Sequence, residues 1–131
     1  MKKLYTRLIT KNDIEDTFGY PLENMVNQGA FASKNLAIDN WLDEACEMVN
    51  DLIIQNRGKD YTKLLNNYIA DEANNESDIY EGMYWAQMYQ MRFIIDNGNI
   101  KANANINEQK KAYDDQVINI LLRYGILGGG Y

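Results

Sequence analysis

The chain contains no histidine and only one cysteine, Cys46. Histidine is the side chain that most often serves as a general base near neutral pH and as a metal ligand. A single cysteine cannot form a disulfide within the chain. These absences disfavour most enzyme chemistries, so we predict a protein with no catalytic residues, no bound metal and no cofactor.

Long apolar runs are also missing. No stretch approaches the roughly 20 apolar residues that cross a bilayer. The first residues, MKKLYTRLIT, carry the cations of a signal peptide but not its apolar run. We therefore expect synthesis in the cytoplasm and no membrane partner.

The composition is that of an ordinary soluble domain. The chain has 131 residues, of which 46% are hydrophobic and 24% are charged. This length fits one hydrophobic core and leaves no room for a second. We predict a single domain with an N-terminal arm at residues 1–9, a helical bundle at 10–124 and a C-terminal tail at 125–131.

Negative charge dominates, with 19 acidic and 13 basic residues and a net charge of -6. This balance disfavours a nucleic-acid-binding surface, which needs clustered cations. The first eleven residues nevertheless hold four cations and no acid, namely Lys2, Lys3, Arg7 and Lys11. Such an arm can contact the acidic body of a neighbouring copy, or it can simply be solvated. The segment from Leu64 to Met91 has no basic residue and is expected to form an acidic face, with Asp71, Glu72, Glu76, Asp78 and Glu81.

Local signals predict an all-α fold, a small helical bundle with an extended arm and a flexible tail. Thr10 and Asp13 resemble a capping box, which predicts a short helix over 11–17 that Gly19 ends. Pro21 can open a second short helix that extends to about residue 27. Residues 3–9 alternate apolar and polar types and suit an extended segment.

Longer helices are indicated by apolar residues at helical spacing. Ser33 caps a helix over 34–56 that Gly58 stops, and Asp60 caps a further segment that ends near residue 74. Ser77 caps a helix over 77–96. A polar loop then precedes the last helix, which begins near residue 107 and ends at Gly125.

The helix over 79–94 carries apolar residues around nearly its whole circumference, so it is either central in the bundle or shared with a partner. Its methionines and tyrosines are most simply core residues. The alternative is a subunit interface, since these types are enriched at interface cores. For that alternative the candidate residues are Lys2, Lys3, Arg7, Tyr80, Tyr84 and Met88.

The tail places two aliphatic residues and a terminal tyrosine around three glycines. We predict that it exposes these side chains and orders on a partner, with the docking residues Ile126, Leu127, Gly128, Gly129, Gly130 and Tyr131. The alternative is a frayed end.

Three possible sites for chemistry are rejected. The carboxylate pairs, such as Asp43 with Glu47, are expected on polar faces rather than in a buried catalytic site. A calcium loop over 97–108 fails because Ala102 stands where glycine is required. Cys46 has acidic or apolar neighbours, which raise a thiol pKa, and is expected to be a packing residue.

The segments LITKNDIEDTFGYPL and NLAIDNWLDEACEMVNDLIIQNRG carry a resemblance to a known family. Taken in order, the chain resembles the head-tail connector (adaptor, or head completion) proteins of long-tailed bacteriophages. The resemblance covers about residues 8–96, and the polar loop over 97–107 departs from it. It implies a virion protein of the phage neck, a homo-oligomer that forms a dodecameric ring. The implied partners are the portal protein and a stopper or tail-completion protein, with DNA only as cargo passing through the lumen.

A rival class is an acidic phage-encoded inhibitor of a host protein, either a DNA mimic or of the anti-CRISPR type. A mimic needs carboxylates at phosphate-like spacing on one convex face, whereas a connector needs complementary flanks and docking arms. The predicted N-terminal arm and C-terminal tail are two separate flexible ends that could serve as docking arms, which favours the connector. A transcriptional regulator is disfavoured because no basic recognition helix is present.

Overall fold

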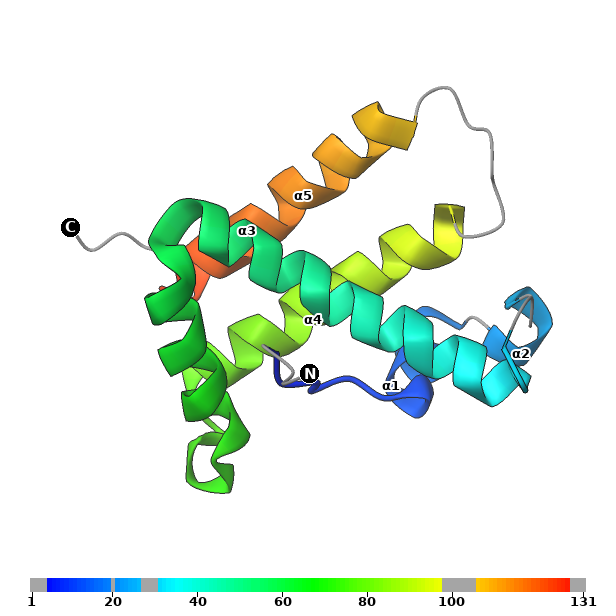
Figure 1. The fold of residues 1–131 in the computed structure, drawn as a ribbon, viewed down its shortest axis with the longest axis horizontal. Helices are drawn as coiled ribbons and strands as arrows, with labels where there is room; N and C mark the ends of the chain where they lie inside the picture. Colours follow the sequence, from blue (N-terminus) through cyan, green and yellow to red (C-terminus); the bar gives the residue numbers. More distant parts are fainter. Residues whose placement is uncertain (1–4, 20, 27–30, 98–105, 128–131) are drawn as a thin grey trace.

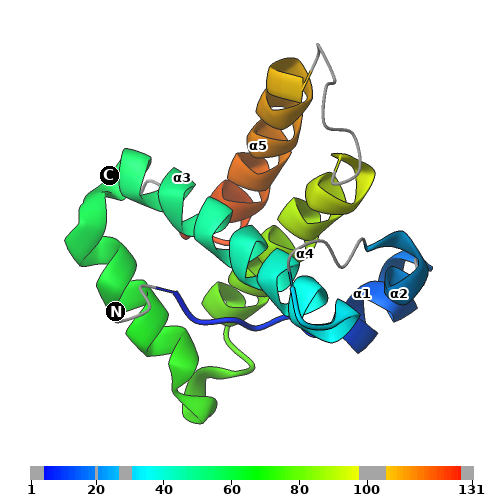
Figure 2. The ribbon, with the colours of Figure 1, turned by 45° about the vertical axis from the view of Figure 1, so that its right-hand side comes forward.

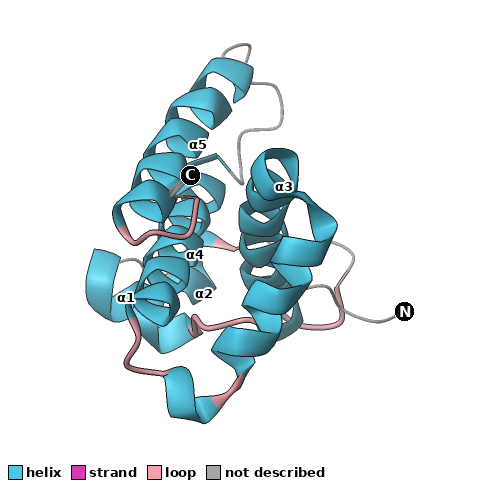
Figure 3. Cartoon of the chain, turned by 90° about the vertical axis from the view of Figure 1, so that its left-hand side faces the viewer, coloured by secondary structure: helices cyan, strands magenta, loops and turns pink. Residues whose placement is uncertain are grey.

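The computed structural model describes residues 5–19, 21–26, 31–97 and 106–127. Within these ranges the chain forms five α-helices and one 3-10 turn, and no strand (Figures 1 and 3). The elements are α1 (Lys11–Phe18), α2 (Leu22–Met25), α3 (Lys34–Ala70), η1 (Glu72–Asn74), α4 (Asp78–Asn97) and α5 (Ile106–Arg123). The predicted all-α bundle is confirmed, and the described part of the arm is extended.

Most helix ends carry the caps that the sequence predicts. Thr10 and Asp13 form the reciprocal hydrogen bonds of a capping box at the start of α1, and Gly19 ends that helix with a φ of 71°. The Ser33 hydroxyl accepts a hydrogen bond from the Leu36 N–H at the start of α3. Ser77 does the same for Tyr80 at the start of α4. The short helix α2 is shorter than predicted.

The longest helix, α3, changes direction at Gly58. This residue has φ 85° and ψ 170°, which is not helical and which side chains with a Cβ rarely adopt. The Thr62 hydroxyl donates to the Gly58 carbonyl oxygen at 2.8 Å across the bend. Gly58 therefore separates two helical parts, as predicted, but without a loop between them. We call them the first part (34–57) and the second part (59–70) of α3.

Helix α4 lies at the centre of the fold and packs against α3, α5 and α1. Its carboxyl-terminal half, with Met88 and Met91, joins a core cluster with α1, α2 and the first part of α3. Its amino-terminal half joins a second cluster with the second part of α3 and with α5. Close approach to α5 needs Gly82, because a Cβ there would lie 2.6 Å from the Tyr124 Cβ. The structure therefore confirms the interpretation that this helix is central in the bundle.

The arm runs between the second part of α3 and α4 (Figure 2), where two buried side-chain amides bind its backbone. The Thr6 N–H donates to the Asn66 Oδ1 at 2.8 Å, and the Gln87 Nε2 donates to the Thr6 carbonyl oxygen at 2.8 Å. The Leu8 N–H donates to the Gln87 Oε1 at 2.9 Å. The amides of Asn66 and Gln87 thus replace the neighbouring strand that an extended segment usually needs.

This pairing makes Gln87 a sensitive position. We expect Gln87→Met to lower the free energy of unfolding by about 2–6 kcal/mol, because two backbone groups of the arm lose their partner at about 1–3 kcal/mol each. Urea denaturation measures the loss, and hydrogen exchange should show faster exchange of the Leu8 amide. Gln116→Met, at an exposed position of α5, is the matched control and should stay within about 0.5 kcal/mol. Equal stability of the two variants would contradict the assignment.

Candidate functional site

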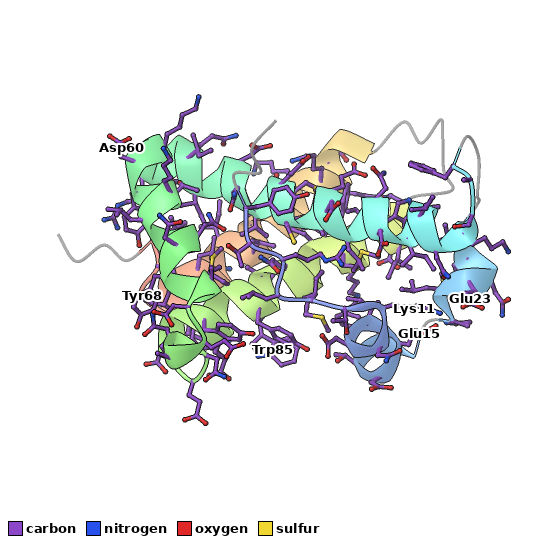
Figure 4. All side chains as sticks on the ribbon, turned by 60° about the horizontal axis from the view of Figure 1, so that its bottom comes forward. Lys11, Glu15, Glu23, Asp60, Tyr68 and Trp85 are labelled. Atoms are coloured by element: carbon purple, nitrogen blue, oxygen red, sulfur yellow. The ribbon has the colours of Figure 1, made fainter. Side chains whose placement is uncertain are left out.

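A groove of about 330 Å³ lies where α3 ends and α4 begins. Ser77 caps α4 there, so the direction of the first turns of the helix is fixed and Tyr80 and Tyr84 share one face. We call it the acidic groove; its lining residues are Asn75, Glu76, Ser77, Tyr80, Glu81, Tyr84 and Trp85. Figure 4 labels one of these lining residues, Trp85.

The aromatic wall of the acidic groove is partly open to solvent. The rings of Tyr84 and Trp85 meet edge to face, with centroids 5.3 Å apart, and Trp85 is 37% exposed. Burial, followed by the Asp13 carboxylate to which it hydrogen-bonds, raises the pKa of Tyr84. That contact connects the groove to α1. Accessible tyrosine and tryptophan faces are typical of the centres of protein interfaces.

The charge around the acidic groove is not neutralised within the described residues. Glu76 and Glu81 line the groove. The predicted acidic face also contributes Asp71, Glu72 and Asp78, all exposed. No salt bridge joins any of these five carboxylates to a cation in the described part of the chain. The surface around the acidic groove therefore carries a net negative charge.

Cations gather at the other end of the second part of α3. Arg57, Lys59 and Lys63 are exposed around the bend at Gly58, with Asp60 among them. The Arg57 guanidinium lies 4.0 Å from the centre of the Tyr61 ring, which holds it in place. We call Arg57, Lys59 and Lys63 the basic corner; Figure 4 labels Asp60 there.

The structure separates the residues predicted for a subunit interface. Tyr80 and Tyr84 do lie together in the acidic groove, half-buried. Met88 is completely buried in the core, so its prediction as an interface residue is wrong. Arg7 lies 3.4 Å from Asp43 and 3.6 Å from Asp39 of its own chain, across its own α3 rather than on a neighbour. Lys2 and Lys3 lie outside the described residues.

The prediction that Ile126 and Leu127 are exposed is wrong, because they are 0% and 7% exposed. The Ile126 N–H donates to the Leu121 carbonyl oxygen and the Gly125 N–H to that of Leu122, which is a Schellman motif. This turn folds Ile126 back onto the bundle, where its carbonyl oxygen accepts a hydrogen bond from the Tyr61 hydroxyl at 2.5 Å. These two side chains are not available for portal docking. Residues 128–131, Gly128, Gly129, Gly130 and Tyr131, lie outside the described part.

Metal-ligating and reactive side chains do not gather in the described residues. No group of three or more cysteine or carboxylate side chains there could hold a metal ion. Cys46 is completely buried beside Ala45 in the core, as a packing residue. No helix in the described ranges combines the length and apolarity needed to cross a membrane.

No family model, no curated protein and no solved structure matches the chain.

The buried tail residues lead to a direct test. We expect Ile126→Ala to lower the free energy of unfolding by about 2–5 kcal/mol, because it leaves a cavity in the second core cluster. Leu122→Ala, on the same helix but 47% exposed, should cost less than about 1 kcal/mol. Chemical denaturation of both variants measures the difference. If both cost the same small amount, Ile126 is not packed as described.

Proposed function

We propose that this chain is a non-catalytic structural subunit of a phage head-tail connector, a ring that joins the DNA-filled capsid to the tail. The observation that carries the proposal is the pair of unlike surfaces on one subunit, the acidic groove and the basic corner. A closed ring of identical subunits needs this kind of head-to-tail contact, in which one patch binds a different patch of the next copy.

The two surfaces are positioned by the same helical segment. The second part of α3 begins at the basic corner and ends at Ala70, a few residues before the acidic groove, a span of about 16 Å at 1.5 Å per residue. In Figure 4 Asp60 is labelled at the upper left of the view and Trp85 near the lower middle, so the two surfaces are apart. A short rigid segment with opposite charge at its ends can dock repeatedly in one direction around a ring.

The exposed apolar side chains add contact area to both surfaces. Leu64, next to Lys63, is 70% exposed, and Tyr68, one turn further along α3, is 39% exposed. Trp85 and the two tyrosines do the same in the acidic groove. Charge therefore selects the docking direction, and apolar contact supplies affinity.

The proposal includes the portal protein on one side of the ring and a stopper or tail-completion protein on the other. DNA is only cargo in the lumen, and the net charge of -6 suits a channel wall that must not retain it. The dodecameric stoichiometry and the location in the virion follow from the resemblance of residues 8–96 to connector proteins.

A second candidate function is an acidic inhibitor that binds a basic surface of a host protein. The carboxylates that line the acidic groove have no salt bridge among the described residues, which favours this function. They suit a basic surface of a host protein as well as the basic corner of a second copy. Against a DNA mimic stands their placement, since Glu76 and Glu81 surround aromatic side chains in a groove rather than follow a convex ridge.

A charge exchange distinguishes a head-to-tail ring from other assemblies. Glu76→Lys with Glu81→Lys reverses the charge of both carboxylates that line the groove, and Lys59→Glu with Lys63→Glu makes the corner acidic. Each double variant alone then repels itself and should be monomeric by size-exclusion chromatography with light scattering, whereas the wild type forms rings. An equal mixture of the two restores opposite charges at every contact and should form rings of alternating subunits.

The control for the charge exchange is Asp16→Lys with Asp51→Lys, two exposed positions outside both surfaces, which should leave the rings intact. A wild type that stays monomeric at every concentration, alone and with the portal, would reject the connector and leave the inhibitor. Rings that persist in both double variants would place the subunit contact elsewhere.

A further inference from the structure

The acidic groove combines carboxylates and aromatic rings in a regular order along the first turns of α4. Tyr80 and Tyr84 are four residues apart, and so are Glu81 and Trp85, so each pair forms a row along the helix. Helical side chains lean toward the amino terminus, which directs the Trp85 ring toward the turn that carries Glu81. A group that binds the Glu81 carboxylate is therefore close to an accessible indole ring.

The chemistry of these walls favours an arginine side chain over a lysine side chain. A guanidinium group is planar, stacks on aromatic rings and binds a carboxylate through two parallel N–H groups. A lysine ammonium is a compact and strongly hydrated charge without a flat face to stack. The acidic groove offers three aromatic rings and two carboxylates within one cavity of about 330 Å³. Both kinds of partner for a guanidinium group are thus present together.

The chain has four arginines, and their contacts single out one of them. Arg7 and Arg92 form salt bridges within the chain, at 3.4 and 3.9 Å. Arg57 and Arg123 are exposed and form no salt bridge among the described residues. Of these two, only Arg57 belongs to the basic corner. The proposed head-to-tail contact therefore brings Arg57 to the acidic groove.

Arg57 is already held in a position that favours docking. Its guanidinium lies 4.0 Å from the centre of the Tyr61 ring, and the side chain is otherwise exposed. A side chain that is held before binding loses less conformational entropy on binding. In Figure 4 the basic corner, labelled at Asp60, is apart from Trp85, so Arg57 is placed for the groove of another copy rather than its own.

We propose that the acidic groove is an arginine-binding site and that its occupant is Arg57 of a second copy of this chain. The guanidinium group stacks on the Trp85 ring and donates its N–H groups to the carboxylates of Glu76 and Glu81. Tyr61 covers the other face of the guanidinium group, so the cation lies between two aromatic rings. This proposal rests on the proposed ring and names the contact between its subunits, to which the lysines of the basic corner add charge only.

Replacement of Arg57 by lysine tests the contact without a change of charge. Arg57→Lys should raise the protein concentration at which rings form about tenfold in size-exclusion chromatography with light scattering, because the planar group is lost. Arg123→Lys, at the other exposed arginine without a salt bridge among the described residues, is the matched control and should shift that concentration less than about twofold. In the mixture of charge-exchanged variants only every second contact keeps the arginine site, so those rings should need a higher concentration than wild-type rings.

A double-mutant cycle shows whether Arg57 and Trp85 are in contact. Trp85→Met keeps an apolar side chain but removes the ring, and alone it should weaken assembly about fivefold. Arg57→Lys with Trp85→Met should weaken assembly about tenfold in total, because the second change removes a contact that the first has already broken. Effects that multiply to about fiftyfold would contradict the stacking of these two side chains.

Selectivity for arginine is also measured without ring formation. The variant with Lys59→Glu and Lys63→Glu retains the acidic groove, and Nα-acetyl-arginine methylamide is the probe. Binding is followed by NMR at the indole N–H of Trp85, with Trp41→Phe to remove the only other indole signal. We expect this probe to bind about fivefold more tightly than Nα-acetyl-lysine methylamide.

Carboxylate variants locate the probe in the groove. Glu81→Gln, at an exposed position of α4, should weaken binding of the arginine probe about fivefold. Glu72→Gln is the matched control, because Glu72 is exposed on the same acidic face and does not line the groove. It should change the Kd less than about twofold.

Three outcomes would overturn the proposal. Equal ring formation by Arg57→Lys and Arg123→Lys would reject Arg57 as the occupant and leave the connector in place. Equal binding of the arginine and lysine probes would show that the groove selects positive charge and not a guanidinium group. An arginine-selective groove in a wild type that never forms rings would assign the arginine to another protein, and it would reject the connector and Arg57 together.

Discussion

An extended segment with no strand beside it must still find hydrogen-bond partners for its backbone, and the rest of this fold is arranged around that requirement. Asn66 and Gln87 supply the partners for residues 6–8 from two different helices. Asn66 lies on the second part of α3, beyond the bend at Gly58. The basic corner lies at the same bend, and α4 begins at the acidic groove and runs through Gln87 to Asn97.

The local features of the fold could be predicted from the sequence, and the packing could not. Thr10, Ser33, Ser77 and Gly125 determine helix ends through their own side chains or backbone, so their roles were predicted from neighbouring residues alone. The burial of Ile126 was missed, because it depends on the Schellman turn and on a groove between helices far apart in the sequence.

In the candidate site, too, the local features could be predicted from the sequence and some of the lining residues could not. The acidic run and the pair Tyr80 and Tyr84 were predicted, since helical spacing places them on one face. Trp85 was missed, although its position next to Tyr84 in an acidic segment was a usable signal.

The hydrogen bonds of the arm also have a consequence for how the chain acquires its structure during synthesis. Thr6 is made early, yet its partners Asn66 and Gln87 follow 60 and 81 residues later. The arm therefore has to wait on the ribosome until the first half of α4 has emerged, and its docking closes a loop of 81 residues. Residues 6–8 thus reach these contacts only after residues that are translated much later, and a nascent chain cut short before Gln87 leaves their backbone without the Gln87 amide.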